Sequence, residues 1–195
     1  MKKIVAAMSG ASGMTYGVRL VSWLVQNNFP VDLLVTRAAG KVFELEIGPL
    51  PKNQAGFRKF FKDAKKLLTL HDPDDFNSPL ASGSGTGDAM VIIPCSMGMV
   101  GRVASGVSTS LTERAADVML KEKRPLVMVF RETPLSLIHI ENLSRLSRAG
   151  AVLMPASPGF YGRPKNIDQL ADGLVGRVLK ELGISNNLEK EWSGK

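Results

Sequence analysis

Short apolar runs alternate along the chain with longer segments whose apolar positions repeat every three or four residues. The runs are five or six residues long and lie at 4–8, 31–36, 89–94, 125–130 and 151–155. Continuous apolar runs of this length are typical of strands that are buried on both faces. The segments between and after them predict helices over 14–27, 37–47, 54–66, 108–123, 134–148 and 166–182, with Ser108 as the candidate N-cap of the fourth.

The segment 48–87 departs from this alternation. Only 54–66 has a helical pattern there, and the stretch HDPDDFNSPLASGSGTGD predicts a loop. We expect one long excursion from a single domain rather than a linker between two. That domain spans 1–195, with a core to about residue 184 and a tail over 185–195.

Five buried strands that alternate with helices predict an α/β fold. Right-handed crossovers then build a three-layer, Rossmann-like or flavodoxin-like parallel sheet with helices on both faces. In such sheets, ligands bind beyond the carboxyl ends of the strands. The residues that follow each apolar run are therefore the place to look for chemistry.

Composition limits the classes of function. The chain has 195 residues, of which 44% are hydrophobic and 6% aromatic, and a net charge of +7. The cations are spread along the sequence and aromatics are few, so a basic enzyme for phosphorylated small molecules fits better than a nucleic-acid binder. No apolar segment is long enough to span a membrane and no export signal is evident, so we expect a cytoplasmic protein. One cysteine and two histidines make a metal centre of these ligands improbable.

The first strand leads into SGASG, a longer run of small residues than a tight turn needs. Gly10 and Gly13 allow backbone N–H groups to approach an anion at the start of the next helix. The glycines fall at 10, 13 and 17 rather than in the G-x-G-x-x-G spacing. The second strand ends in Thr36-Arg37, where a dinucleotide site would place an acidic residue. A mononucleotide therefore fits better than NAD, and a strand-to-helix crossing that merely requires small residues is the alternative.

The stretch PCSMGMVG after the third strand repeats this chemistry. Ser96 and Gly98 could present backbone amides to a second part of a ligand. Met97 and Met99 could lie against a flat ring or belong to the core. Cys95 has no histidine partner evident in the sequence, which favours a buried structural thiol over a nucleophile.

Charged residues supply further candidates. Arg114 and Lys121 are seven residues apart and so share one helix face, either as solvated surface cations or as an anion site. Arg131 and Glu132 directly follow a buried strand, an unfavourable place for unused charge, which favours a functional pair over a simple ion pair.

Four other polar residues have weaker patterns. Glu46 fits an ordinary carboxylate at a helix end, and Arg177 fits a surface position on the last helix. Tyr161 lies in the loop SPGFYGRP, and loops at strand ends commonly carry function. His139, in SLIHIEN, is expected to pack or to cap a helix rather than to catalyse.

Several of these segments together resemble one known family. TERAADVMLKEKRPLV, RETP and PASPGFY are specific to the flavin prenyltransferases of the UbiX type, and the resemblance extends from IVAAMSGASGMTYGVRL to the last helix. It implies a flavodoxin-like fold and a reaction in which a dimethylallyl group passes from dimethylallyl monophosphate to reduced FMN. A fourth ring closes through N5 and C6 of the flavin, and phosphate is released. It also implies a homo-oligomer, often a dodecamer, and a UbiD-type decarboxylase as recipient of the prenylated FMN.

The resemblance assigns roles to individual residues. FMN would be bound by Gly10, Ala11, Ser12, Thr36, Ser96, Met97, Gly98, Met99 and Arg131. The donor would be bound by Arg114, Lys121, Tyr161 and Arg177, the last two from a neighbouring subunit. Catalysis would involve Glu46, Lys121, Glu132 and Ser12, with either glutamate as the base if burial raises its pKa.

Two features qualify the resemblance. Phe76 stands where the family often has a tryptophan, and Trp192 matches the family's tail tryptophan. The aspartates of HDPDD lie outside the strand ends, which favours metal-independent transfer.

A flavoprotein of the cysteine-decarboxylating kind and a non-enzymatic flavin-carrying subunit of a decarboxylase are the alternatives to a prenyltransferase.

Overall fold

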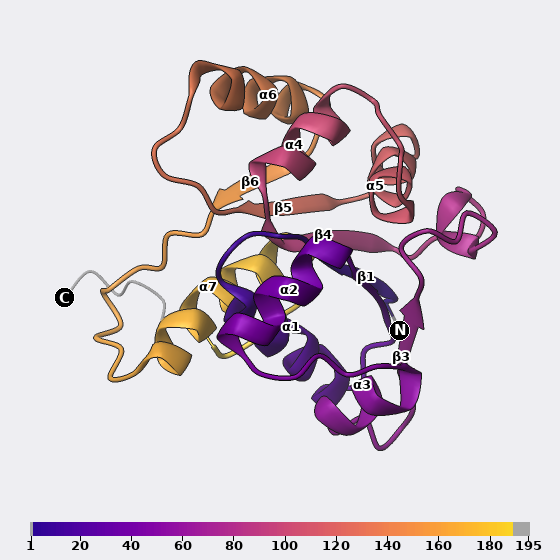
Figure 1. Cartoon of the computed structure of the whole chain (residues 1–195). Helices are drawn as coiled ribbons and strands as arrows, with labels where there is room; N and C mark the ends of the chain where they lie inside the picture. Colours follow the sequence, from indigo (N-terminus) through magenta and orange to yellow (C-terminus); the bar gives the residue numbers. More distant parts are fainter. Residues whose placement is uncertain (1, 189–195) are drawn as a thin grey trace.

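The computed structural model describes residues 2–188 and shows a sheet with helices on both faces (Figure 1). The strands are β1 (Ile4–Met8), β2 (Val31–Val35), β3 (Leu68–His71), β4 (Ala89–Cys95), β5 (Leu126–Phe130) and β6 (Val152–Pro155). The helices are α1 (Met14–Gln26), α2 (Arg37–Glu46), α3 (Gln54–Phe60), α4 (Met97–Ala104), α5 (Leu111–Lys121), α6 (Leu137–Arg148), α7 (Ile167–Glu181) and the 3₁₀ turn η1 (Pro79–Ala81).

The sheet has six strands in the order β3-β2-β1-β4-β5-β6, and every neighbouring pair is parallel. The α/β class and the parallel sheet are therefore confirmed. This order is the Rossmann order, in which the chain reverses direction across the sheet between β1 and β4. The carboxyl ends of these two strands border the crevice where such folds place a ligand.

The sequence pattern missed β3 and α4. β3 lies at the sheet edge, and only Leu68 of its residues is fully buried, so it lacks the continuous apolar run of the inner strands. No element was predicted directly after β4, where α4 begins after the N-cap Ser96.

The expected start of α5 at Ser108 is wrong. The carboxylate of Glu113 accepts hydrogen bonds from the backbone N–H groups of Thr109 (2.6 Å) and Ser110 (3.0 Å), so the helix begins at Leu111.

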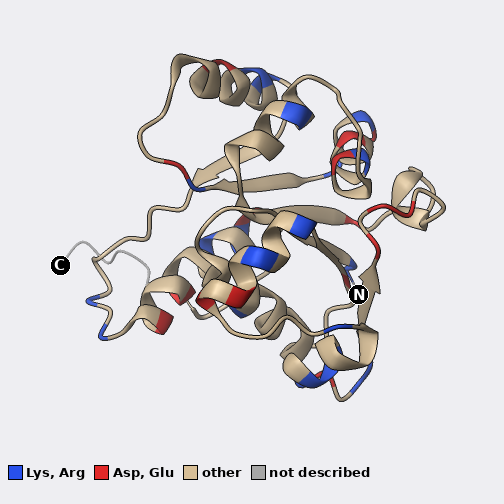
Figure 2. Ribbon diagram, viewed as in Figure 1, with Lys and Arg blue, Asp and Glu red and all other residues tan. Residues whose placement is uncertain are grey.

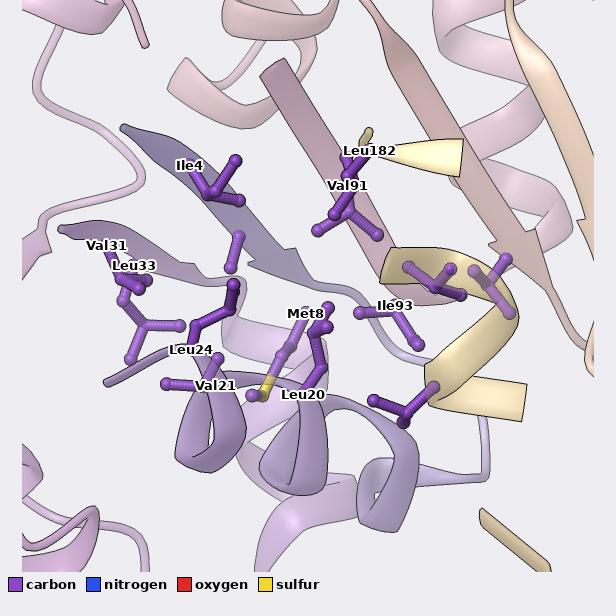
Figure 3. Close-up of a cluster of buried hydrophobic side chains, with 14 of the residues drawn as sticks. Ile4, Met8, Leu20, Val21, Leu24, Val31, Leu33, Val91, Ile93 and Leu182 are labelled. Atoms are coloured by element: carbon purple, nitrogen blue, oxygen red, sulfur yellow. The ribbon is translucent and has the colours of Figure 1, made fainter. Parts of the chain in front are cut away.

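Two apolar layers pack on opposite faces of the sheet. On one face, side chains of β1, β2 and β4 meet those of α1 and α7, including Leu20, Leu24 and Leu182, which are fully buried (Figure 3). On the other face, Val5 and Ile92 meet α4, α5 and α6. A fully buried aliphatic side chain stabilises the fold by about 1.5–3 kcal/mol, so these layers fix the positions of the strand ends.

The positive charge is more concentrated than the sequence analysis assumed. Lys52, Arg58, Lys59, Lys62, Lys65 and Lys66 lie on α3 and its flanking turns, beside the edge strand β3 (Figure 2). Lysines next to an edge strand oppose pairing with another chain. The cluster therefore has a structural explanation that needs no nucleic acid.

Trp192 and most of the expected tail lie outside the described residues. Across residues 2–188, none of the helices combines the length and the apolar character needed to cross a lipid bilayer.

Gly17 sets how closely α1 approaches β4. A Cβ atom at this position would lie 2.5 Å from the carbonyl oxygen of Ile93, whereas one at Gly173 on α7 would meet nothing within 4 Å. We expect Gly17→Ala to lower the free energy of unfolding by about 1–3 kcal/mol because the helix must move away. The matched Gly173→Ala should raise it by about 0.5–1 kcal/mol through helix propensity. Urea denaturation of both variants measures the difference, and equal stabilisation would contradict the close approach.

Candidate active site

The ends of β1 and β4 are tied together by Ser9, a residue that the sequence analysis did not single out. Its side chain is buried, and its Oγ accepts a 2.8 Å hydrogen bond from the backbone N–H of Ser96. The backbone N–H of Ser9 in turn donates to the carbonyl of Pro94 at 3.1 Å. The loop SGASG and the start of α4 are thereby held side by side at the point where the strand order reverses.

Gly10 is required by the packing of this loop against α2. A Cβ atom at Gly10 would lie 2.6 Å from the Cβ of Ala38, which is closer than real side chains approach. Gly13 adopts a left-handed conformation with φ of 103°, which glycine tolerates best. The small residues of SGASG therefore serve the strand-to-helix crossing, which was the structural alternative in the sequence analysis.

The N-terminus of α1 holds an anion that belongs to the chain itself. Glu46, the last residue of α2, accepts hydrogen bonds from the backbone N–H groups of Gly13 (2.9 Å) and Met14 (2.8 Å). A carboxylate at this position is favourable because it satisfies otherwise unpaired donors and lies at the positive end of the helix dipole. In this structure the donors that were expected to hold a ligand phosphate at α1 are thus engaged by Glu46.

Ser12, Glu46 and Arg131 form one electrostatic group. Burial acts to raise the pKa of Glu46, but hydrogen bonds from the Ser12 hydroxyl and from the two backbone N–H groups lower it, as does the charge of Arg131. The net pKa lies below the ordinary value. The condition set for Glu46 as a base, that burial raises its pKa, is therefore not met in this structure.

Two other helices begin at the same edge of the sheet. Thr36 caps α2 by accepting from the N–H of Ala39 at 3.1 Å, and Ser96 caps α4 by accepting from the N–H of Met99 at 3.3 Å. The N–H groups of Met97 and Gly98 belong to the first turn of α4, which helix hydrogen bonds do not reach. These donors suit an anionic or carbonyl group of a ligand.

The methionine side chains at α4 belong to the core. Met97 and Met99 are 4% and 1% exposed and pack in the apolar layer under α4. A ligand at the strand ends would therefore meet the backbone of Met97 and Met99 rather than their side chains.

Arg131 carries the clearest indication of a ligand-binding role. Its Nε is buried and has no hydrogen-bond partner among the described residues. Its backbone N–H donates to the carbonyl of Cys95 at 3.1 Å, which places the residue beside the β4 end. A buried guanidinium donor is costly to leave unpaired, so the site fits an acceptor-rich ligand.

Cys95 is fully buried, and burial raises its pKa to about 12. This confirms the prediction that Cys95 is a buried structural thiol.

His139 caps α6, because its Nδ1 accepts from the N–H of Ser136 at 3.3 Å, which confirms the predicted capping role. Glu132 is exposed and accepts from the backbone N–H of Thr133 at 3.2 Å.

The four expected donor-binding residues divide into two groups that one chain keeps apart. Arg114 and Lys121 lie on α5, whereas Tyr161 follows β6 and Arg177 lies on α7. In Figure 1, α5 and the segment between β6 and α7 lie at opposite sides of the molecule. Lys121 also ends α5 shortly before β5 begins, so it lies toward the amino-terminal edge of the sheet, away from SGASG.

Each group has contacts within the chain. Lys121 pairs with Glu122, and Arg114 donates to the carbonyl of Ala81 at 3.0 Å and to Asp117 at 2.7 Å. Tyr161 is 85% exposed.

Within residues 2–188, no three His, Cys, Asp or Glu side chains are placed to hold a metal ion.

The contact between Glu46 and α1 makes stability depend on pH. Because the folded pKa of Glu46 is lowered, the contact stabilises the fold fully above the ordinary glutamate pKa of 4.5 and is lost as pH falls through the folded value. We expect Glu46→Gln to lower the free energy of unfolding at pH 7 by about 0.3–1 kcal/mol, as for an exposed helix-end charge. The difference from the wild type should shrink below pH 4.5. Urea denaturation across this range tests it, with Glu44→Gln on the same helix as control, and a pH-independent difference would contradict it.

Comparison with known proteins identifies the family. A family model described as Flavoprotein matches residues 1–179. The flavin prenyltransferase UbiX of Alkalihalophilus pseudofirmus is 46% identical over 192 residues, which cover 98% of this chain and 96% of the relative.

Solved structures agree. AnUbiX (PadA1), crystallised with FMN and dimethylallyl pyrophosphate, is 35% identical with a TM-score of 0.89, covering 100% of this chain and 98% of its own. A dodecameric FMN-dependent UbiX-like decarboxylase from Escherichia coli O157:H7 is 36% identical with a TM-score of 0.87, covering 98% and 100%. The chain belongs to the Flavoprotein family and, within it, to the UbiX flavin prenyltransferases.

Proposed function

We propose that this protein transfers a dimethylallyl group from dimethylallyl monophosphate to reduced FMN and releases phosphate. The observation that carries the proposal is identity of 46% over nearly the whole length to a flavin prenyltransferase. The strand ends of this chain supply chemistry that suits both phosphate esters. The product, prenylated FMN, would serve a UbiD-type decarboxylase.

The residues at the β1, β2, β4 and β5 ends fit FMN. The free first-turn N–H groups of α4 and the unpaired Nε of Arg131 are donors that match the phosphate, ribityl and carbonyl oxygens of a flavin nucleotide. We assign the site to Gly10, Ala11, Ser12, Thr36, Ser96, Met97, Gly98, Met99 and Arg131. Because Glu46 occupies the α1 terminus, the α4 terminus is the better position for the phosphate.

The donor phosphate requires cations. A monophosphate leaves more readily when its developing charge is neutralised, and Arg114, Lys121 and Arg177 can supply this while Tyr161 adds a hydrogen bond. The acidic HDPDD stretch has other contacts: Asp74 pairs with Arg37, and Asp72 accepts from a backbone N–H at 2.9 Å. We therefore propose transfer without a metal ion.

Proton handling falls to residues beside the flavin site. Transfer breaks the carbon–oxygen bond of the ester, forms a bond to N5 of the flavin and releases the N5 proton. Ring closure then adds a proton to the C=C bond of the transferred group, forms the bond to C6 and releases the C6 proton. Glu46, Glu132 and Ser12 are the groups we assign to this proton. Ser12 hydrogen-bonds Glu46 in this structure, so the two would act together. General acid–base help of this kind contributes about 10²–10⁴-fold.

The separation of the donor-binding residues supports an active site between subunits. In one chain Lys121 lies away from Tyr161 and Arg177, so a neighbouring copy must bring the two groups together. The UbiX-like neighbour from Escherichia coli is dodecameric. We propose a homo-oligomer in which neighbouring copies pair these two groups of residues, most simply a dodecamer, acting in the cytoplasm.

The direct test is anaerobic incubation of the purified protein with reduced FMN and dimethylallyl monophosphate. We expect a flavin heavier by one dimethylallyl unit in mass spectrometry, together with free phosphate. The Escherichia coli neighbour is named a decarboxylase, so a parallel reaction with an aromatic acrylic acid and oxidised FMN tests that second function by release of CO₂. Binding of FMN with neither product would instead support a flavin carrier.

A shared active site predicts complementation between inactive subunits. Tyr161→Phe and Lys121→Ala should each reduce turnover, since each weakens a different half of the donor site. Oligomers reassembled from a mixture contain some sites in which both halves are intact, so mixing should restore part of the activity. Separate reassembly of each variant is the control. Absence of any recovery would count against sharing.

A further inference from the structure

His71 connects a buried carboxylate to the segment that follows β3. Asp32, in β2, is 1% exposed, and its Oδ1 lies 2.9 Å from Nε2 of His71. Nδ1 of the same ring lies 2.9 Å from Oγ of Ser78. Because a carboxylate only accepts, Nε2 carries the proton in the neutral ring and the Ser78 hydroxyl donates to Nδ1.

Asp32, at the buried end of this series of hydrogen bonds, has a second charged partner. Lys3 lies 2.7 Å from Oδ2 of Asp32. Burial acts to raise the pKa of Asp32, but hydrogen bonds and charges from His71 and Lys3 outweigh it and keep the carboxylate charged. The imidazole is therefore fixed at one end and transmits its position to Ser78.

The order Ser–His–Asp does not make a hydrolytic site here. Ser78 is only 6% exposed, and its Oγ also accepts from the backbone N–H of Leu80 at 3.4 Å. A nucleophile needs access to substrate, which this hydroxyl lacks. Its role is to cap the turn η1.

The turn η1 leads directly to a proposed donor-binding residue. The N–H of Ala81 donates to the carbonyl of Ser78 at 3.0 Å, and the carbonyl of Ala81 accepts from Nε of Arg114 at 3.0 Å. With Asp117 on Nη1, these two contacts set the direction of the guanidinium. His71, Ser78 and Ala81 thus form a continuous path from the edge strand β3 to Arg114.

We propose that His71 is a positioning residue for the donor phosphate: through Ser78 and the turn η1 it holds the Ala81 carbonyl that orients Arg114. This inference rests on the proposed function, specifically on the assignment of Arg114 to the donor. His71 itself touches no substrate. Its effect is on donor affinity and not on FMN.

Two variants remove the same link by different means. Ser78→Ala deletes the hydroxyl, and His71→Gln can keep a donor toward Asp32 but places no acceptor at the position of Nδ1, which faces Ser78. Each should weaken binding of dimethylallyl monophosphate to the FMN-loaded protein about three- to tenfold, as for loss of one neutral hydrogen bond. Calorimetry measures this, and the affinity for FMN should not change. Ser84→Ala, a hydroxyl deletion in the same segment, is the matched control and should bind the donor like the wild type.

A double-mutant cycle with Arg114→Ala separates positioning from general destabilisation. If His71 acts through Arg114, Ser78→Ala should have no further effect on donor affinity once Arg114 is removed. The same fold loss in both backgrounds, or a parallel loss of FMN affinity, would overturn the proposal. So would a wild-type protein that does not bind the donor.

The two proposals fail in different ways. A wild-type protein that forms prenylated FMN but shows no coupling keeps the function and overturns the role of His71. One that binds the donor with coupling but forms no product keeps the role of His71 and overturns the function.

Discussion

The contact of Glu46 with the N-terminus of α1 decides where charge can be placed in this site. In many nucleotide-binding folds the first helix after β1 receives the ligand phosphate on its free N–H groups. Here α2 ends in a carboxylate that takes two of those donors at 2.8–2.9 Å. The negative charge that the helix attracts is supplied by the protein, and the ligand phosphate must find other donors. The first turn of α4 and Arg131 offer donors at the same edge of the sheet.

This arrangement explains why a carboxylate and a guanidinium lie at the same edge of the sheet. Arg131 lowers the pKa of Glu46 in the described structure, while its buried Nε has no partner among residues 2–188. An anionic group of the flavin nucleotide that accepts from Arg131 would offset the positive charge that lowers the pKa of Glu46. The pKa of Glu46 would then rise toward the range in which a carboxylate exchanges protons effectively near neutrality. Ligand binding and activation of the carboxylate would then be coupled.

The sequence predicted the inner strands well because each is buried on both faces and therefore continuously apolar. It missed β3, since an edge strand needs only Leu68 fully buried and shows no such run. At the site, SGASG predicted a ligand anion beside α1, and nothing in the local pattern shows that the carboxylate of Glu46, 33 residues beyond Gly13, takes these donors instead. The same limit applies to the link between Asp32, His71 and Ser78, which depends on pairing of β2 with β3.

The positions of Lys121 and Tyr161 decide whether a single chain can bring both residues to one phosphate. α5 ends near the amino-terminal edge of the sheet, whereas the β6 end lies at the opposite edge, so no side-chain rotation within one chain joins them. A phosphate that needs both must therefore lie between two copies. The apolar side chains exposed on α6 and beside Tyr161, among them Leu137, Ile138 and Phe160, are 68–70% exposed. A surface of this kind is costly in water and favourable between subunits. If copies associate through this surface, which includes the residue next to Tyr161, assembly would also bring Tyr161 to the donor site of a neighbour.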